Sequence, residues 1–224
     1  MVPDLDKSRS IETRLRITEI FQSLQGEARS VGFPTIFIRL TGCPLRCVYC
    51  DTAYAFSGGN WHSLDTVMQE VKQFSARHVT VTGGEPLAQQ ACLPLLVQLC
   101  DAGYDVSLET SGSMDITAVD PRVSRVMDLK TPSSGEQQKN LLSNLEQLTL
   151  NDQLKFVISD RNDFDWSVQH INQSGLQGQT ELLMSPVHGV LEPAQLAEWI
   201  LESGLQVRFQ MQLHKLLWGD EPGR

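Results

Sequence analysis

Three cysteines lie close together in this 224-residue chain, at Cys43, Cys47 and Cys50. Thiolates at these spacings can converge on one metal centre, but they supply only three ligands, whereas a structural zinc site takes four. Cysteine thiolates are also the ligands of iron–sulfur clusters. The trio therefore predicts a cluster with one iron left open for a substrate or cofactor, which indicates an enzyme.

A zinc site, or cysteines without a metal, is the alternative. The nearest histidine, His62, lies beyond the turn at Gly58-Gly59, so it is a poor candidate for a fourth ligand. Free cysteines also occur as inert core residues. Cys92 and Cys100 fit that description, because they belong to a segment with apolar residues at helical spacing.

The composition is typical of one globular domain. Hydrophobic residues make up 41% of the chain and charged residues 20%, and the net charge is −9 without any basic run. Binding to a phosphate backbone needs a positive patch, so we expect no nucleic-acid partner. The polar start and the lack of a long apolar stretch predict no secretory signal, no membrane partner and a cytoplasmic location. We expect a flexible N-terminal tail over residues 1–13 and a single domain over residues 14–224.

Strand-like and helix-like segments alternate along the chain. The expected strands cover residues 35–40, 78–82, 105–109, 125–129, 154–158, 181–184 and 207–211. Expected helices follow Ser63 and Pro193 and cover residues 89–102 and 164–173. This alternation predicts an α/β fold, an incomplete TIM-type (β/α) barrel with six to seven mostly parallel strands, with a flat doubly wound sheet as the alternative. Polar motifs follow the strands, so we expect the active site at their carboxyl ends.

Two of these motifs resemble the signatures of radical S-adenosylmethionine enzymes. The cysteine spacing C-x-x-x-C-x-x-C, with Tyr49 before the last cysteine, is the first, and Thr82-Gly-Gly-Glu-Pro86 is the second. The resemblance implies a 4Fe–4S cluster on the three cysteines, with S-adenosylmethionine bound to the fourth iron. The glycines permit close approach of the backbone, and Glu85 offers a carboxylate to the ammonium group of the cofactor.

Nearly the whole chain after residue 13 resembles the 7-carboxy-7-deazaguanine synthase family. The shared segments are Glu19–Glu27, Arg39, Cys50–Thr52, Glu109–Gly112 and Gln212–Lys215. The resemblance implies a lyase that converts 6-carboxy-5,6,7,8-tetrahydropterin to 7-carboxy-7-deazaguanine with loss of ammonia, in queuosine biosynthesis. It also implies a reduced barrel, a homodimer, a requirement for magnesium, and an electron-donor protein such as a flavodoxin.

The same resemblance implies individual roles. The expected substrate-binding residues are Leu24, Gln25, Gly26, Glu27, Arg39, Thr110, His214 and Arg224. The expected contacts of S-adenosylmethionine are Tyr49, Asp51, Glu85, Gly112, Asp128, Leu129, Lys130, Ser185 and Pro186. Thr52 would supply an oxygen to magnesium, which prefers oxygen donors. No side chain is assigned as an acid or base. The chain departs from its relatives at Ala28, where a glycine is common, and at Asp128-Leu129, where many have Ser-Pro.

Two other functions compete with this interpretation. A glycyl-radical activating enzyme shares the cysteine spacing but acts on a protein, and it does not need Arg39, His214 or the Leu24–Glu27 segment. A non-catalytic metal-binding protein would contain zinc and no sulfide. Three of the single residues also have an alternative interpretation. Arg39 could be a solvated charge, His214 a structural histidine and Thr52 a residue that bonds its own backbone.

Overall fold

The structure, a computed structural model, describes residues 14–219, 221 and 223. The expected tail over residues 1–13 and the expected ligand Arg224 lie outside these residues. Seven parallel strands follow one another across a single sheet, and their order in the sheet is the order in the chain. They are β2 (Pro34–Leu40), β4 (His78–Gly83), β5 (Asp105–Thr110), β6 (Ser124–Asp128), β7 (Gln153–Ile158), β8 (Glu181–Pro186) and β9 (Arg208–Phe209).

Two further strands extend the sheet beyond β2. β1 (Arg14–Leu24) pairs antiparallel with β2, and β3 (Asn60–Ser63) pairs antiparallel with β1. The expected count of six to seven strands was therefore too low for the sheet, although it fits the parallel part. β1 was missed because only Leu15 and Ile17 are buried, so its sequence lacks the apolar run of a central strand. The sheet does not close on itself, which confirms the incomplete barrel.

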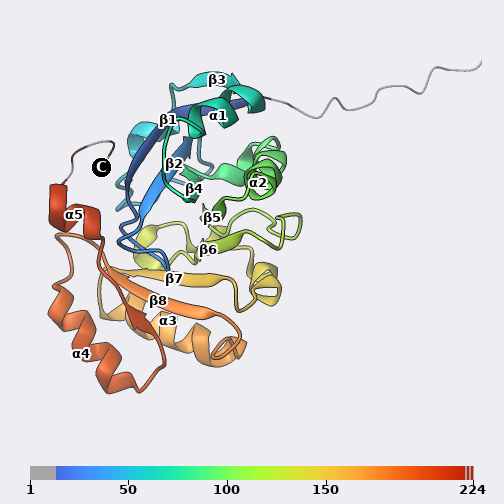
Figure 1. Cartoon of the computed structure of the whole chain (residues 1–224). Helices are drawn as coiled ribbons and strands as arrows, with labels where there is room; N and C mark the ends of the chain where they lie inside the picture. The colour runs from blue at the N-terminus through green and yellow to red at the C-terminus, as the bar shows by residue number, and fades with distance from the viewer. Residues whose placement is uncertain (1–13, 220, 222, 224) are drawn as a thin grey trace, which may run out of the picture.

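The helices have clear capping residues at several of their ends. They are α1 (Leu64–Val71), α2 (Cys92–Asp101), α3 (Arg161–Ser174), α4 (Pro193–Ser203) and α5 (Leu213–Trp218). Ser63 caps α1 by accepting a hydrogen bond from the backbone of Thr66, and Gly175 and Gly204 adopt the left-handed conformation after α3 and α4. In Figure 1, α1 to α4 follow the outside of the curved sheet, whereas α5 lies apart beside the loop between β1 and β2.

Side chains alternate between the two faces of the parallel strands. On β5, Val106 and Leu108 are buried in the apolar core between sheet and helices. Ser107 and Glu109 point to the other face, where they meet Thr80 and Thr82 of β4 at 2.8 Å each. The inner face of the partial barrel is therefore polar, and it is the face on which a ligand can be bound.

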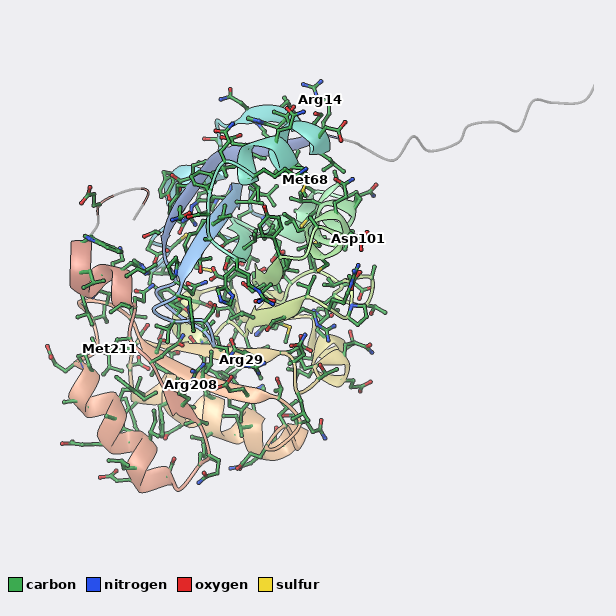
Figure 2. The ribbon with its side chains drawn as sticks, viewed as in Figure 1. Arg14, Arg29, Met68, Asp101, Arg208 and Met211 are labelled. Atoms are coloured by element: carbon green, nitrogen blue, oxygen red, sulfur yellow. The ribbon has the colours of Figure 1, made fainter. Side chains whose placement is uncertain are left out.

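The β1–β2 loop crosses to the far side of the sheet. The backbone N–H of Arg29 donates to Gln153 on β7 at 3.0 Å, and its guanidinium pairs with Glu181 on β8. Arg208 on β9 pairs with the same carboxylate at 3.1 Å. Figure 2 shows Arg29 and Arg208 near each other below the end of the loop. These contacts hold the loop in place where the barrel is open.

No helix in the part of the chain that the structure describes is both long and apolar enough to span a bilayer.

A buried ion pair joins β6 to the start of β7, and we expect it to be a large contributor to stability. Asp152, which is 1% exposed, receives the guanidinium of Arg125 and two hydrogen bonds from Thr149. Asp152→Asn leaves the cation without its counter-charge, so we expect a loss of about 3 kcal/mol or more in the free energy of unfolding. Urea denaturation measures this loss, with Asp101→Asn at an exposed helix end as the matched control.

The same pair predicts a pH dependence. Burial alone would raise the pKa of Asp152, but hydrogen bonds from Arg125 and Thr149 lower it below its ordinary value. A carboxyl whose pKa is lower in the folded state stabilises the fold above its unfolded pKa, and this stabilisation is lost as the pH falls. The difference in stability between wild type and Asp152→Asn should therefore shrink on acidification. A difference that is constant from neutral to acidic pH would contradict the role of the ion pair.

Candidate functional site

A cavity of about 620 Å³ lies at the carboxyl ends of the parallel strands. Its wall includes most of the residues that the sequence predicted for the site. Those expected residues are Leu24, Gln25, Gly26, Glu27, Arg39, Cys43, Cys47, Tyr49, Cys50, Asp51, Thr52, Thr110, Asp128, Lys130, Ser185, Pro186 and His214. Glu85, Gly112 and Leu129 are not part of this wall. Segments far apart in the chain thus meet at one edge of the sheet, as expected for an α/β fold.

The cysteine loop follows β2 and presents all three thiols to the cavity. Cys43, Cys47 and Cys50 are free and partly exposed. The loop is held by the backbone N–H of Val48, which donates to Ser134 at 3.0 Å. Burial raises the pKa of the Cys43 and Cys47 thiols, so a metal must displace their protons when it binds.

The spread of the thiols fits a cluster better than a single ion. Within residues 14–219, 221 and 223, no three His, Cys, Asp or Glu side chains are gathered closely enough to hold one metal ion. In an iron–sulfur cluster each thiolate binds a different iron, so three separated thiols on one wall are suitable ligands. The donor chemistry therefore agrees with a 4Fe–4S cluster on Cys43, Cys47 and Cys50.

Two glycines let the end of β4 pack against this loop. A Cβ atom on Gly84 would lie 2.2 Å from the carbonyl oxygen of Gly42 and 2.6 Å from Cβ of Cys43. A Cβ on Gly83, whose φ is 148°, would lie 2.2 Å from the carbonyl oxygen of Leu40. No larger residue fits at either position, because real Cβ atoms do not approach so closely. The backbone of Gly83 and Gly84 also lines the cavity, within reach of a bound cofactor.

Glu85 is held by hydrogen bonds within the protein. Its side chain is fully buried and accepts hydrogen bonds from the hydroxyl of Thr110 and from the backbone and hydroxyl of Ser111. It also caps the short 3-10 helix η2 (Pro86–Ala88) by accepting from the backbone of Leu87. Glu85 thus ties the end of β4 to the end of β5. Its expected contact with the ammonium of the cofactor stays a prediction.

Gly112 and Leu129 lie behind the wall of the cavity. Leu129 is 1% exposed and belongs to the core, and Gly112 adopts a positive φ of 72° next to Met127. Their neighbours Ser111 and Lys130 line the cavity, whereas the expected contacts of Gly112 and Leu129 stay predictions.

Arg39 lies on the inner face of β2 and is only 15% exposed, so it is not a solvated surface charge. Its Nε donates to Glu19 at 2.7 Å, and Tyr54 donates to the same carboxylate at 2.8 Å. The guanidinium also lies 5.8 Å from the ring centres of Phe21 and Tyr54. Among the described residues, its two terminal nitrogens make no hydrogen bond. Arg39 can therefore present a fork of donors to a ligand carboxylate.

Three oxygens on the cavity wall are buried without a hydrogen-bond partner among the described residues. They belong to Glu27 (Oε1), Asp128 (Oδ1) and Ser185 (Oγ). Leaving a buried polar atom unpaired costs free energy, so such atoms indicate where a polar ligand binds. The second oxygens of the two carboxylates are paired, Glu27 with Lys155 at 2.7 Å and Asp128 with Lys130 at 3.0 Å.

Of the two lysines, only one was predicted from the sequence to belong to the site. Lys130 was expected in the site, but Lys155 on β7 and Glu109 on β5 were given no role. Burial alone would lower the pKa of Lys130 and Lys155, but the charges of Asp128 and Glu27 raise it. A signal was present in Leu154-Lys-Phe-Val-Ile158, because a lysine inside a buried apolar strand needs a partner or a ligand.

Tyr49, Asp51 and Thr52 follow the second cysteine closely. Burial and the charge of Asp128 raise the pKa of Tyr49 to about 12, so its phenol stays neutral. The hydroxyl of Thr52 donates to Asp51 at 2.8 Å, so it does not bond its own backbone. Burial alone would raise the pKa of Asp51, but hydrogen bonds from Thr52 and Gln212 lower it. Thr52 and Asp51 thus offer two oxygens to a hard cation at the rim of the cavity.

The helix α5 brings His214 to the β1–β2 loop. The backbone N–H of Leu213 donates to Gly26 at 2.9 Å, and Gln212 donates to Asp51 at 3.1 Å. Burial lowers the pKa of His214, so its ring is neutral at pH 7. A neutral imidazole both donates and accepts, which suits contact with a polar ligand.

Comparison with known proteins places this site in a family. The family model of the radical SAM superfamily matches residues 37–130. The 7-carboxy-7-deazaguanine synthase of Chlorobaculum tepidum is 43% identical over 216 residues, which cover 95% of this chain and 98% of that protein. The protein of the same name from Koribacter versatilis is 40% identical, with 92% and 98% covered. The crystal structure of QueE from Escherichia coli superposes with a TM-score of 0.76 at 25% identity, and covers 90% of this chain and 95% of that one.

The contact between Gly26 and His214 gives a prediction. A Cβ on Gly26 would lie 2.2 Å from Nδ1 of His214. Gly26→Ala should therefore push the ring away and cost about 1–3 kcal/mol of stability, the usual range for overpacking. Thermal unfolding measures the loss. The double variant Gly26→Ala/His214→Ala removes the clash and should regain most of it. If the double variant is no more stable than Gly26→Ala, the close packing is not the cause.

Proposed function

This chain belongs to the 7-carboxy-7-deazaguanine synthase family of radical S-adenosylmethionine enzymes, and we propose that it converts 6-carboxy-5,6,7,8-tetrahydropterin to 7-carboxy-7-deazaguanine with loss of ammonia. It is thus a carbon–nitrogen lyase of queuosine biosynthesis. The observation that carries the proposal is the meeting of three thiols with Arg39 and Thr52 in one cavity. The relatives carry the same name and match nearly the whole chain. They therefore give no support to the alternative of a glycyl-radical activating enzyme.

The cofactors would be held by residues already described. Cys43, Cys47 and Cys50 would hold the 4Fe–4S cluster, and S-adenosylmethionine would lie between the cysteine loop and the ends of β6 and β8. When bound, the cluster and S-adenosylmethionine supply the one-electron chemistry that removes a hydrogen atom from the substrate. The cofactor side of the cavity would consist of residues that line it, namely Tyr49, Asp51, Ser111, Asp128, Lys130, Ser185 and Pro186.

The substrate side is formed by β1, β2 and α5. Arg39 would pair with the carboxylate of the pterin, and Gln25 with Glu27 would read the donors and acceptors of its ring edge. The neutral His214 would contact the substrate from α5. Leu24, Gly26 and Thr110 would also line the substrate side. Mg²⁺ on Thr52 would orient the substrate carboxylate and offset its charge. We further propose a cytoplasmic homodimer that receives electrons from a flavodoxin-like protein.

The central experiment is anaerobic reconstitution with iron and sulfide, followed by turnover. We expect about four iron and four sulfide per chain, as the cluster type requires, and product that depends on S-adenosylmethionine, Mg²⁺ and a reductant. Cleavage of S-adenosylmethionine without any deazaguanine would remove the substrate assignment but keep the cofactor chemistry. Protein that takes up zinc and no sulfide would overturn both.

The cysteines provide a matched pair of variants. Cys47→Ala should lose the visible absorption of the cluster and all turnover, because two thiolates remain on the cavity. Cys100→Ala should keep both, since Cys100 lies on α2 away from the cavity. Iron and sulfide analysis after reconstitution measures the difference. Equal cluster content in the two variants would exclude Cys47 as a ligand.

Arg39 is tested by its effect on substrate affinity. Arg39→Gln keeps hydrogen-bonding capacity but loses the charge, and a charged hydrogen bond contributes about 1.5–3 kcal/mol. We expect KM for the pterin to rise about 10-fold to 100-fold, with a smaller change in kcat. The control is Arg161→Gln on the exposed face of α3. An unchanged KM in Arg39→Gln would remove Arg39 from the substrate site.

A further inference from the structure

Two carboxyl groups on the cavity wall, those of Glu27 and Glu109, have unequal surroundings. Glu27 comes from the β1–β2 loop and Glu109 from the end of β5, and both line the cavity. Catalytic acids and bases are often found as such pairs, in which the environment keeps one group ionised and the other neutral.

Glu27 forms an ion pair with a lysine on the cavity wall. Its Oε2 receives Lys155 Nζ at 2.7 Å, and both side chains are nearly buried, with 12% and 11% exposed. The second oxygen, Oε1, is buried and has no partner among the described residues. Glu27 therefore keeps one oxygen available to accept a proton or a hydrogen bond from a ligand.

Among the residues that the structure describes, none forms an ion pair with Glu109. Its carboxyl accepts from the hydroxyl of Thr82 at 2.8 Å and from the amide of Gln25 at 3.5 Å. Burial raises its pKa, and the charge of Glu27 adds to the rise, while Lys155, Thr82 and Arg39 act in the opposite direction. The net effect is a raised pKa, which favours the protonated form of Glu109 more than that of an exposed glutamate, and a protonated carboxyl can donate a proton.

Gln25 fixes the two groups relative to each other. Its Nε2 donates to Thr80 at 3.0 Å and to Glu109, and its Oε1 accepts from the backbone N–H of Glu27 at 3.3 Å. Gln25 is 3% exposed, so this amide cannot easily turn away. The acid and the base therefore occupy fixed places on one wall.

We propose that Glu109 donates the proton to the leaving nitrogen and that Glu27 accepts the proton lost from the neighbouring carbon when ammonia is eliminated. The inference rests on the proposed function and assigns the proton transfers within it. The C–N bond breaks with its electron pair on nitrogen, and the pair of the C–H bond forms the new C=C bond. Nitrogen gains one proton and carbon loses one, so no oxidant or reductant is consumed. A proton returned from Glu27 to Glu109 restores both groups.

The test separates this late step from the first one. Glu109→Gln is assayed with substrate deuterated at the carbon that bears the carboxylate. We expect deuterium to reach the 5′ carbon of the cofactor or of 5′-deoxyadenosine at a rate within about threefold of wild type. Release of ammonia and formation of deazaguanine should fall about 100-fold or more, the usual contribution of a general acid. Glu202→Gln, the same change at an exposed site on α4, should alter neither rate.

Three further readouts exclude a purely structural role. The cluster-free Glu109→Gln chain should bind 7-carboxy-7-deazaguanine within about threefold of wild type. Glu109→Asp, which keeps an acid, should regain at least a tenth of the wild-type product rate. The wild-type product rate should fall as rising pH ionises Glu109, and this limb should be absent in Glu109→Gln.

Several results would overturn the inference. One is equal loss of deuterium transfer and product together with weak ligand binding, because it would show that Glu109 only shapes the pocket. Another is a normal product rate in Glu109→Gln, or equal rates in the Asp and Gln variants. Failure of the wild-type enzyme to form any deazaguanine is a separate outcome, which removes the proposed function and this inference with it.

Discussion

Charge inside a half-open barrel must be balanced locally, and three ion pairs meet this requirement. Arg39 with Glu19, Lys155 with Glu27 and Lys130 with Asp128 lie around one cavity, each with both partners largely withdrawn from water. Removing one member of such a pair costs several kcal/mol, because it leaves the other charge buried without a partner. Among the described residues, one oxygen each of Glu27 and Asp128 and the terminal nitrogens of Arg39 have no hydrogen-bond partner, so a polar ligand in the cavity can bind them.

The rigidity of the wall comes from residues behind it. Glu85 joins the turn that packs on the cysteine loop to the end of β5, which carries Glu109 and Thr110. On the opposite side, contacts from Arg29 to β7 and β8 fix the loop that carries Gln25 and Glu27. The cluster ligands and the substrate-side residues are thus attached to the same sheet. A radical reaction needs this, because a small misplacement of the reacting atoms slows it strongly.

The sequence predicted the parallel strands well because their apolar runs are bounded by glycine and polar motifs. It also predicted the residues that gather at the cavity, since motifs at the carboxyl ends of parallel strands must meet. It failed where the deciding information is three-dimensional. The carboxylate of Glu85 accepts hydrogen bonds from residues that lie 25 and 26 positions later in the chain, and no local pattern reveals these partners. Glu109 stood in a strand that looked ordinary, and Lys155 carried a signal only through its place inside an apolar strand. Their partners come from other elements of the fold. β1 was missed because only Leu15 and Ile17 of this antiparallel strand are buried, so it has no distinctive apolar run.

The open sheet has two ends, and both are short. β3 has four residues and β9 only two. Exposed strand edges offer unpaired backbone groups to other chains, and long flat edges lead to aggregation. A closed barrel avoids this problem by having no edge. Because β3 and β9 are so short, this sheet can stay open and still offer neighbouring molecules little backbone to which a strand could be added.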